Sequence, residues 1–333
     1  LGDVAAAVRA GAEGVIYADL SEDEFKRTDE RTTHADALYQ QAAFDEARAL
    51  FEKAEAMQKD LQPAYPLLYS VRGFRYCDFL LGPSERSAWQ VLVQAPIGDQ
   101  RSAPGGARSS SADMDRAPPS AQNAPPSLRG GEADKAIQSK AMGSGLRRSA
   151  RNDDAETLAP LFDACSDVAK RAEQTLEWFA SRYPRLDIAL DHLTLARAEL
   201  YATILRGATP DCAHVDAAAN GLRDAGQKDD QPRGHLTRAL YRGVTGNIPG
   251  AREDLDEAYE IAERGPMKLH LADIHLHRAR LFGLYAKRPV KYPWESPQRD
   301  LAEARRLIEE CGYWRRREEL EDAEAALRAL QQD

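Results

Sequence analysis

Apolar and small residues recur along the chain in one short pattern: an alanine, a large apolar residue four positions later, and a small residue three positions after that. These offsets place all three side chains on one stripe of an α-helix. Each copy therefore predicts a helix that packs closely against a neighbour. The copies are Ala47/Phe51/Ala54, Ala218/Leu222/Ala225, Ala251/Leu255/Ala258, Ala304/Ile308/Cys311 and a degenerate one, Ala7/Gly11/Gly14.

A second pattern lies upstream of the last three full stripes and sets a period. It reads Leu-x-Arg-Ala, and its alanines, Ala198, Ala239 and Ala279, are 41 and 40 residues apart. A fixed period of this size is typical of stacked two-helix units, because one helical hairpin cannot bury its own apolar face. The pattern predicts an all-α fold, an α-solenoid of antiparallel helical hairpins.

Breaks in the pattern give the expected boundaries. A helix start is expected at 21–24, and Gly82-Pro83 is expected to end a helix because the residue before proline avoids the α region. The expected helices and hairpins lie at 1–20, 31–41 with 45–59, 66–81, 157–182, 187–226, 231–264 and 269–311, followed by a charged capping helix at 315–331.

The stretch 91–154 has a different character. It is rich in Ser, Pro, Gly and Ala and shows no period, so it buries too little surface to offset the entropy lost on ordering. We expect a disordered insertion within one repeat, with TPR-like hairpins at 1–90 before it and at 155–333 after it. A solvated linker is the favoured interpretation, and its basic bias makes contact with an anionic partner the alternative.

The clearest units resemble the tetratricopeptide repeat (TPR). The small residue of the first helix and the alanine of the second are 12 positions apart in Ala35 to Ala47 and in Ala239 to Ala251. In that family, small residues let two helices pack closely and a large apolar residue fills the next groove. The matching positions are Ala35, Ala37, Leu38, Phe44, Ala47, Phe51 and Ala54, and later Gly246, Ile248, Ala251, Leu255 and Ala258.

The chain departs from the TPR pattern in two ways. The aromatic residue usual early in the first helix is absent, since Arg31 and His235 stand there, and the period is longer. HEAT-like helical repeats are therefore the alternative. The C-terminal part also resembles the repeat tails of large bacterial signalling proteins, and the first residues, which begin at Leu1, suggest a fragment of a longer protein.

Composition narrows the classes of partner. The net charge of -9 and the pI of about 5.4 disfavour a nucleic-acid binder. The apolar runs are too short for a membrane span. The four cysteines are far apart, with no CxxC pair, which favours a cytoplasmic protein in which they serve as small apolar residues.

The sequence contains no phosphate-binding loop, zinc-protease motif or nucleophile elbow, so we expect no enzyme activity and no cofactor. One cluster resembles a metal site: His270, Asp273 and His277 share one helix face. Because the outer two are about 10 Å apart along the axis, we expect no metal. In the alternative we favour, Asp273 pairs with His277 and His270 faces solvent.

Two further features have a structural and a functional interpretation. The recurring Arg197, Arg238 and Arg278 suggest salt bridges between repeats, and an anion-binding ladder is the alternative. Trp294 and Trp314, with the basic residues 315–317, are candidate partner contacts, and covering the last hairpin is an equally good explanation of Trp294.

Function follows from the resemblance alone. It implies a non-catalytic interaction scaffold or sensor that binds a peptide or protein in a superhelical groove. The alternative is the ligand-sensing arm of a larger NTPase or effector whose catalytic module lies elsewhere. The implied groove residues are Asp29, Thr32, Asp36, Tyr39 and Gln40, with His192, Leu195, Glu199 and Thr203.

The same patterns assign buried and exposed faces. Ala251 is expected where two helices touch, so that Ala251→Leu is strongly destabilising. Arg280 is expected on an exposed face, so that Arg280→Leu is mild.

Overall fold

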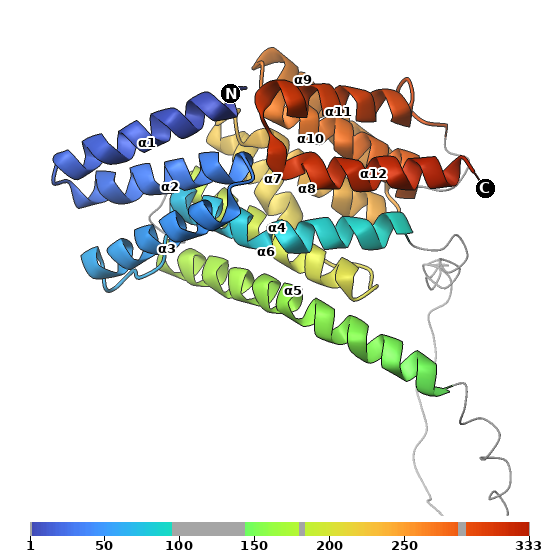
Figure 1. Cartoon of the computed structure of the whole chain (residues 1–333), viewed down its shortest axis with the longest axis horizontal. Coiled ribbons are helices and arrows are strands. Elements are labelled where there is room, and N and C mark those ends of the chain that lie inside the picture. Colours follow the sequence, from blue (N-terminus) through green and yellow to red (C-terminus); the bar gives the residue numbers. More distant parts are fainter. Residues whose placement is uncertain (1, 95–143, 180–183, 286–290, 333) are drawn as a thin grey trace, which may run out of the picture. The chain divides into compact units, whose positions relative to one another are not determined.

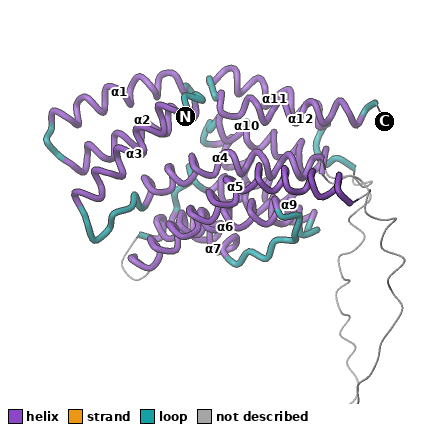
Figure 2. The backbone as a smooth tube through the Cα atoms, turned by 60° about the horizontal axis from the view of Figure 1, so that its bottom comes forward, coloured by secondary structure: helices purple, strands orange, loops and turns teal. Residues whose placement is uncertain are grey.

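The computed structural model describes residues 2–94, 144–179, 184–285 and 291–332. Within these ranges the regular structure is helical and contains no strand (Figure 1, Figure 2). Contacts divide the chain into a large unit of residues 1–95 and 158–333 and a second unit of residues 96–157. The prediction of an all-α protein is confirmed for the described residues. None of the described helices is both long and apolar enough to cross a bilayer.

The helices follow one another with short connections between most of them. Their bounds are α1 Val4–Leu20, α2 Glu24–Gln40, α3 Phe44–Leu61, α4 Ser70–Gln94, α5 Ser144–Phe179, α6 Arg185–Leu205, α7 His214–Ala225, α8 Gln231–Val244, α9 Ile248–Arg264, α10 Lys268–Arg278, the π-helical segment η2 Ala279–Tyr285, α11 Pro297–Cys311, the 3₁₀ turn η3 Trp314–Arg316 and α12 Arg317–Leu330.

Consecutive helices pack as pairs. Extensive contacts join α2 to α3, α6 to α7, α8 to α9 and α10 to α11, and α4 packs as closely on α6. Within the large unit α5 lies against α4, where the Ser84 hydroxyl donates to the Leu161 carbonyl at 3.1 Å. These pairs correspond to the expected hairpins, and α1 packs on α2.

The small-residue stripes lie where paired helices meet. Ala47, Phe51 and Ala54 of α3 have no exposed surface, and the same holds for the α9 stripe that begins at Ala251. Small side chains bring the helix axes close, and a leucine or phenylalanine fills the space between them. Close approach also explains Gly11 of α1, where an added Cβ would lie 2.9 Å from the His34 Cα.

Helix α4 differs from the prediction. It runs from Ser70 to Gln94 through Pro83, which was expected to end it. A proline inside a helix removes one hydrogen bond and costs about 3 kcal/mol, but burial on both sides of it, at Leu81 and Trp89, offsets that cost. Gly82 serves packing rather than termination, because a Cβ there would lie 2.5 Å from the Tyr39 hydroxyl.

The expected insertion at 91–154 falls largely outside the described residues, which exclude 95–143. At its edges the structure is helical, since α4 extends to Gln94 and α5 begins at Ser144. After Gly145 the sequence up to Thr157 contains neither glycine nor proline, so nothing there interrupts a helix.

The C-terminal segment returns to the first hairpins. The η3 turn contacts α2, and α12 packs beside α4 (Figure 1). Arg86 of α4 pairs with Asp322 of α12 at 2.9 Å. The last helix is therefore more than the polar cap expected from its sequence, because Glu319 and Leu320 of its first turn are buried in the large unit.

Arg280 corrects the predicted faces. It is only 2% exposed, because the η2 segment turns it toward α4 and α12. Its guanidinium donates to Glu319 at 2.7 Å and lies 4.1 Å from the ring centroid of Trp89. The sequence pattern placed Arg280 on an exposed face because a regular 3.6-residue period does not anticipate a π-helical turn.

Ala251→Leu should lower the free energy of unfolding by roughly 1–3 kcal/mol, because the added methylene groups have no space at a fully buried helix contact. Urea unfolding followed by circular dichroism measures this. The matched control is Ala217→Leu on α7, where the alanine is exposed. Equal midpoint shifts in the two variants would contradict the packing described here.

Arg280→Leu should be severe rather than mild, with a loss of about 3 kcal/mol or more, because it takes a buried cation from the Glu319 carboxylate. The control is Arg252→Leu, which removes an ion pair to Asp256 from a side chain 54% exposed and should cost less than about 1 kcal/mol. Similar unfolding midpoints for the two variants would show that Arg280 carries no buried pair.

Candidate functional site

The first helices of the hairpins surround one cavity. Its volume is about 130 Å³, and α2, α4, α6, α8 and α10 each contribute to its wall. The C-terminal segment Tyr313–Arg316 completes the lining. We call this space the central cavity. Residues from distant parts of the sequence meet there, while the second helices α3, α7, α9 and α11 contribute nothing to its lining.

A buried ion-pair network forms much of the cavity wall. Its centre is Asp78 of α4, which has a 3% exposed side chain and accepts bonds from two guanidinium groups. Arg197 of α6 donates to one carboxylate oxygen at 2.6 Å, and Arg315 of η3 donates to the other at 2.8 Å. The Arg315 guanidinium also lies 4.3 Å from the ring centroid of Tyr39. The network thereby joins α2, α4, α6 and η3.

Arg316 extends the network toward α10 and α12. It lies 3.1 Å from Glu85 and donates to Asp273 at 2.8 Å and to Glu319 at 2.5 Å. The Tyr313 hydroxyl donates to the same Asp273 carboxylate at 3.1 Å. Each acidic group in the network has at least one guanidinium partner, so these buried charges are compensated.

The network holds its carboxyl groups in the charged form. Burial, the largest influence, would raise the pKa of Asp78, but Arg315, Arg197 and Arg233 together hold that pKa well below its usual range. Burial is opposed in the same way at Glu85, where Arg316, Arg197 and Arg315 lower the pKa to about 2. Groups with such low pKa values are fixed anions at neutral pH rather than proton carriers.

Three polar atoms of the cavity lining are buried without a hydrogen-bond partner among the described residues. They are Nδ1 of His270 and the Nε atoms of Arg233 and Arg315. His270 donates through Nε2 to the Asp229 carbonyl at 2.9 Å, so its free Nδ1 is an acceptor in the neutral ring. Burial and then Arg233 lower the pKa of His270 to about 4, which keeps the ring neutral.

The groove residues expected on α2 lie in different environments. Asp36 and Gln40 line the central cavity, and the Gln40 amide donates to Asp36 at 2.8 Å. Tyr39 is buried beneath Arg315. Thr32 has no exposed surface, and its hydroxyl donates to the carbonyl of the half-buried Asp29 at 2.8 Å.

The groove residues expected on α6 lie away from the cavity. His192 stacks on His214 of α7, with 2.9 Å between their Nδ1 atoms, and Glu199 accepts from the Cys212 thiol at 3.1 Å. Leu195 is buried and Thr203 is half-buried. The residues of α6 that do line the cavity are Arg197 and Tyr201. Because α6 is largely buried all round, its apolar pattern does not reveal which face points inward.

Sequence reasoning did not identify the buried acids Asp78 and Glu85 or their cationic partners Arg315 and Arg316. Asp78 stands inside an apolar run of α4, which is an available signal, since an isolated acid among buried residues needs a cation. Arg315 and Arg316 were interpreted as a surface contact for a partner. They lie inside the large unit instead, while Trp314 beside them is 39% exposed.

The face of His270, Asp273 and His277 does not converge on one point. His277 donates through Nδ1 to the Asp273 backbone carbonyl at 2.8 Å, and the Asp273 carboxylate is occupied by Arg316 and Tyr313. The expected pairing of Asp273 with His277 thus runs through the backbone oxygen. His270 is half-buried rather than facing solvent.

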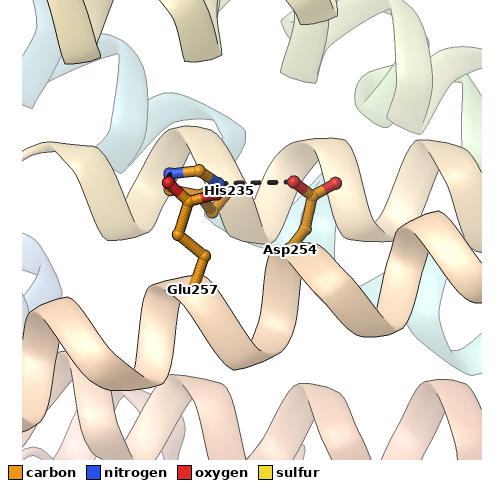
Figure 3. Close-up of side chains that lie close together, drawn as sticks. All are labelled: His235, Asp254 and Glu257. Atoms are coloured by element: carbon orange, nitrogen blue, oxygen red, sulfur yellow. Dashed lines mark hydrogen bonds and ion pairs between the residues drawn. The ribbon is translucent and has the colours of Figure 1, made fainter.

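Another cluster has metal-type donors close together: His235 of α8 with Asp254 and Glu257 of α9 (Figure 3). One ligand atom from each lies within 4.8 Å of the others. However, Asp254 already receives Arg238 at 2.7 Å and Arg242 at 2.9 Å. The Asp254 carboxylate therefore belongs to an ion-pair cluster within the α8–α9 hairpin. Its two guanidinium groups would repel a metal cation.

The expected salt bridges between repeats are present for two of the three recurring arginines. Arg197 and Arg278 pair with the preceding hairpins, to Asp78 and Asp256, whereas Arg238 pairs within its own hairpin. The cysteines are free and buried. Trp294 covers the last hairpin, packed edge-on against Phe282 at 5.2 Å between ring centroids.

Stability should fall as the pH drops from 6.5 toward 5, because His277 is neutral when folded and takes up a proton on unfolding. Burial and then Arg280 lower its folded pKa to about 3, against about 6.5 in the unfolded chain. Each pH unit in this window costs up to about 1.4 kcal/mol per such histidine. In His277→Gln, urea titrations at several pH values should give a shallower dependence, and an unchanged slope would contradict this assignment.

Comparison with known proteins adds no assignment: no family model matches the chain, and neither the curated proteins nor the solved structures contain a match.

Proposed function

We propose that this chain is a non-catalytic binding module, a TPR-like α-solenoid whose inner wall forms a sensor site for a small molecule. The observation that carries the proposal is the central cavity, lined by the first helix of each successive hairpin and completed by Tyr313–Arg316. In a stack of helical hairpins, the first helices form the inner wall, which is the surface such repeats use for recognition. HEAT-like stacking would use the same wall.

The size of the cavity favours a small ligand over the extended peptide that the sequence suggested. Its volume of about 130 Å³ is close to the ~150 Å³ engineered cavity that holds one benzene molecule. A peptide lying along this wall would have to displace Arg315 and Arg316, and their release would leave Asp78, Glu85 and Asp273 with fewer cations. Breaking buried pairs of this kind costs about 3–5 kcal/mol each.

The non-catalytic part of the proposal follows from how the ionisable groups are used. Asp78, Glu85 and Asp273 are engaged with guanidinium groups and held charged, so they support the wall instead of transferring protons. A sensor of this kind suits either an independent module or the ligand-sensing arm of a larger NTPase or effector. The full-length gene distinguishes these two settings.

A second candidate function, a scaffold for a protein partner, is favoured by one exposed apolar surface. Ile16, Tyr17 and Leu20 of α1 are 60%, 70% and 74% exposed, and Phe25 at the start of α2 is 54% exposed. Large apolar side chains grouped at one hairpin tip are typical of protein contact sites. This surface is separate from the central cavity, so the two functions are compatible in one molecule.

The sensor proposal predicts that a small molecule stabilises the chain through the cavity. A thermal-shift screen with soluble cations, anions, zwitterions and neutral compounds should yield at least one that raises the melting temperature by about 5 °C at 100-fold excess over its Kd. Thr237→Phe, which fills the cavity from α8, should abolish that shift.

Thr245→Phe is the matched control, because Thr245 ends the same helix, is exposed and makes the same type of hydroxyl bond to a carbonyl four residues earlier. The control should keep the shift. A screen without stabilising compounds, or shifts that survive Thr237→Phe, would overturn the sensor proposal.

A further inference from the structure

The charges of the central cavity leave one carboxylate without an ion pair and one guanidinium with a single long one. Asp78, Glu85 and Asp273 are engaged by Arg197, Arg315 and Arg316 as described. The remaining Asp and Arg residues of the lining are Asp36 on α2 and Arg233 on α8. They form no ion pair with each other, so both keep their charge available to a ligand.

Asp36 is an acceptor with spare capacity. Its carboxylate receives one bond, from the Gln40 amide at 2.8 Å, and no ion pair with any residue in the described ranges. It is half-buried, at a part of the lining that reaches solvent. A partly desolvated carboxylate without a cation is stabilised when a cation binds to it. An ammonium group supplies both a positive charge and hydrogen-bond donors.

Arg233 is the complementary donor. Its closest ionic contact is 3.9 Å to an Asp78 oxygen that already accepts from Arg315 at 2.8 Å. Its guanidinium lies 5.2 Å from the ring centroid of Phe74, which holds it in place, and its Nε is buried without a partner. A guanidinium that lies beside a ring and is short of acceptors is suited to a carboxylate, which it can bind through two nitrogens.

One part of the lining is apolar. Leu236 and Leu240 of α8, together with Met267 before α10, are each no more than 6% exposed and face the same cavity. A ligand with a short apolar body is therefore accommodated beside its polar ends.

We propose that the central cavity binds a small zwitterion of the size of a free α-amino acid, with its ammonium group on Asp36 and its carboxylate on Arg233. The apolar body packs against Leu236, Leu240 and Met267, and the free Nδ1 of His270 accepts a further hydrogen bond. This inference rests on the proposed sensor function and names its ligand class. A simple anion would satisfy Arg233 but be repelled by Asp36, and a simple cation would meet the reverse penalty.

The test is isothermal titration calorimetry of the full chain with the common L-amino acids, one at a time. The best binder is then compared with its carboxamide, which lacks the negative charge, and with its N-acetyl derivative, which lacks the positive charge. Each derivative should bind about tenfold more weakly or worse, since each loses one charged hydrogen-bonded contact.

Two variants assign the charges to residues. Asp36→Asn should weaken the amino acid about tenfold and leave the N-acetyl derivative unchanged or tighter, while Arg233→Gln should weaken the amino acid and spare the carboxamide. Asp29→Asn, on the same helix as Asp36 but outside the cavity lining, and Arg9→Gln, on the exposed surface of α1, should bind like the parent. Circular dichroism checks folding, and Arg233→Met, which removes the charge and keeps an unbranched side chain, replaces Arg233→Gln if the latter unfolds.

The outcomes separate this inference from the function beneath it. If other library compounds bind in the cavity and no amino acid does, the ligand class is wrong and the sensor proposal stands. Equal binding of either derivative, or an unchanged affinity in Asp36→Asn, would also overturn the zwitterion. If nothing binds in the cavity at all, both proposals fail.

Discussion

Compensation of buried charge is the constraint on which the interior of this protein depends. Asp78 and Glu85 are on the face of α4 that the other helices cover, and a carboxylate buried without a cation costs several kcal/mol. Helix α4 is therefore buried only in an arrangement that delivers Arg197 from α6 and Arg315 and Arg316 from the C-terminal turn. Desolvation offsets much of the attraction, so apolar packing drives folding while the ion pairs select which surfaces meet.

This constraint also determines what kind of site the central cavity offers. In an array without such a turn, the first helices would present a groove that is open along its length. Here Tyr313–Arg316 lies across these helices, bound to residues of α2, α4 and α10. The segment uses up the carboxylates that would otherwise attract a basic peptide. What remains is a limited space whose free charges are Asp36 and Arg233.

The sequence predicted most of the helices because their contacts are local and periodic. The stripe at Ala251 and the spacing from Ala239 to Ala251 depend only on neighbouring helices, which follow each other in the chain. Pro83 misled the prediction because its local penalty is offset by tertiary burial, which no local pattern reports. Arg280 misled it because a π-helical turn rotates the side chain off the regular face.

The candidate site was only partly predictable for a related reason. Asp36 and Gln40 of α2 were identified because the resemblance to the tetratricopeptide repeat implies these groove positions, and both line the cavity. On α6 both faces are buried, and the cavity residue Arg197 is distinguished only by its partner Asp78 on α4, while Tyr201 accepts a bond from Arg197 itself. The pairing of Asp78 with Arg315 joins residues separated by 237 positions, a distance at which no sequence spacing carries information.

The geometry around Arg233 determines how a ligand would affect the rest of the molecule. Because Arg233 is 3.9 Å from Asp78, while Arg197 and Arg315 bond that carboxylate directly, a ligand carboxylate can take Arg233 without leaving Asp78 unpaired. The network therefore survives binding, and the ligand adds a connection between α2 and α8. Arg315 stacks on Tyr39 of the same α2 helix, so a ligand that fixes α2 also favours the docked position of the C-terminal turn. In the proposed sensor, binding at Asp36 would in this way be coupled to the position of the C-terminal turn.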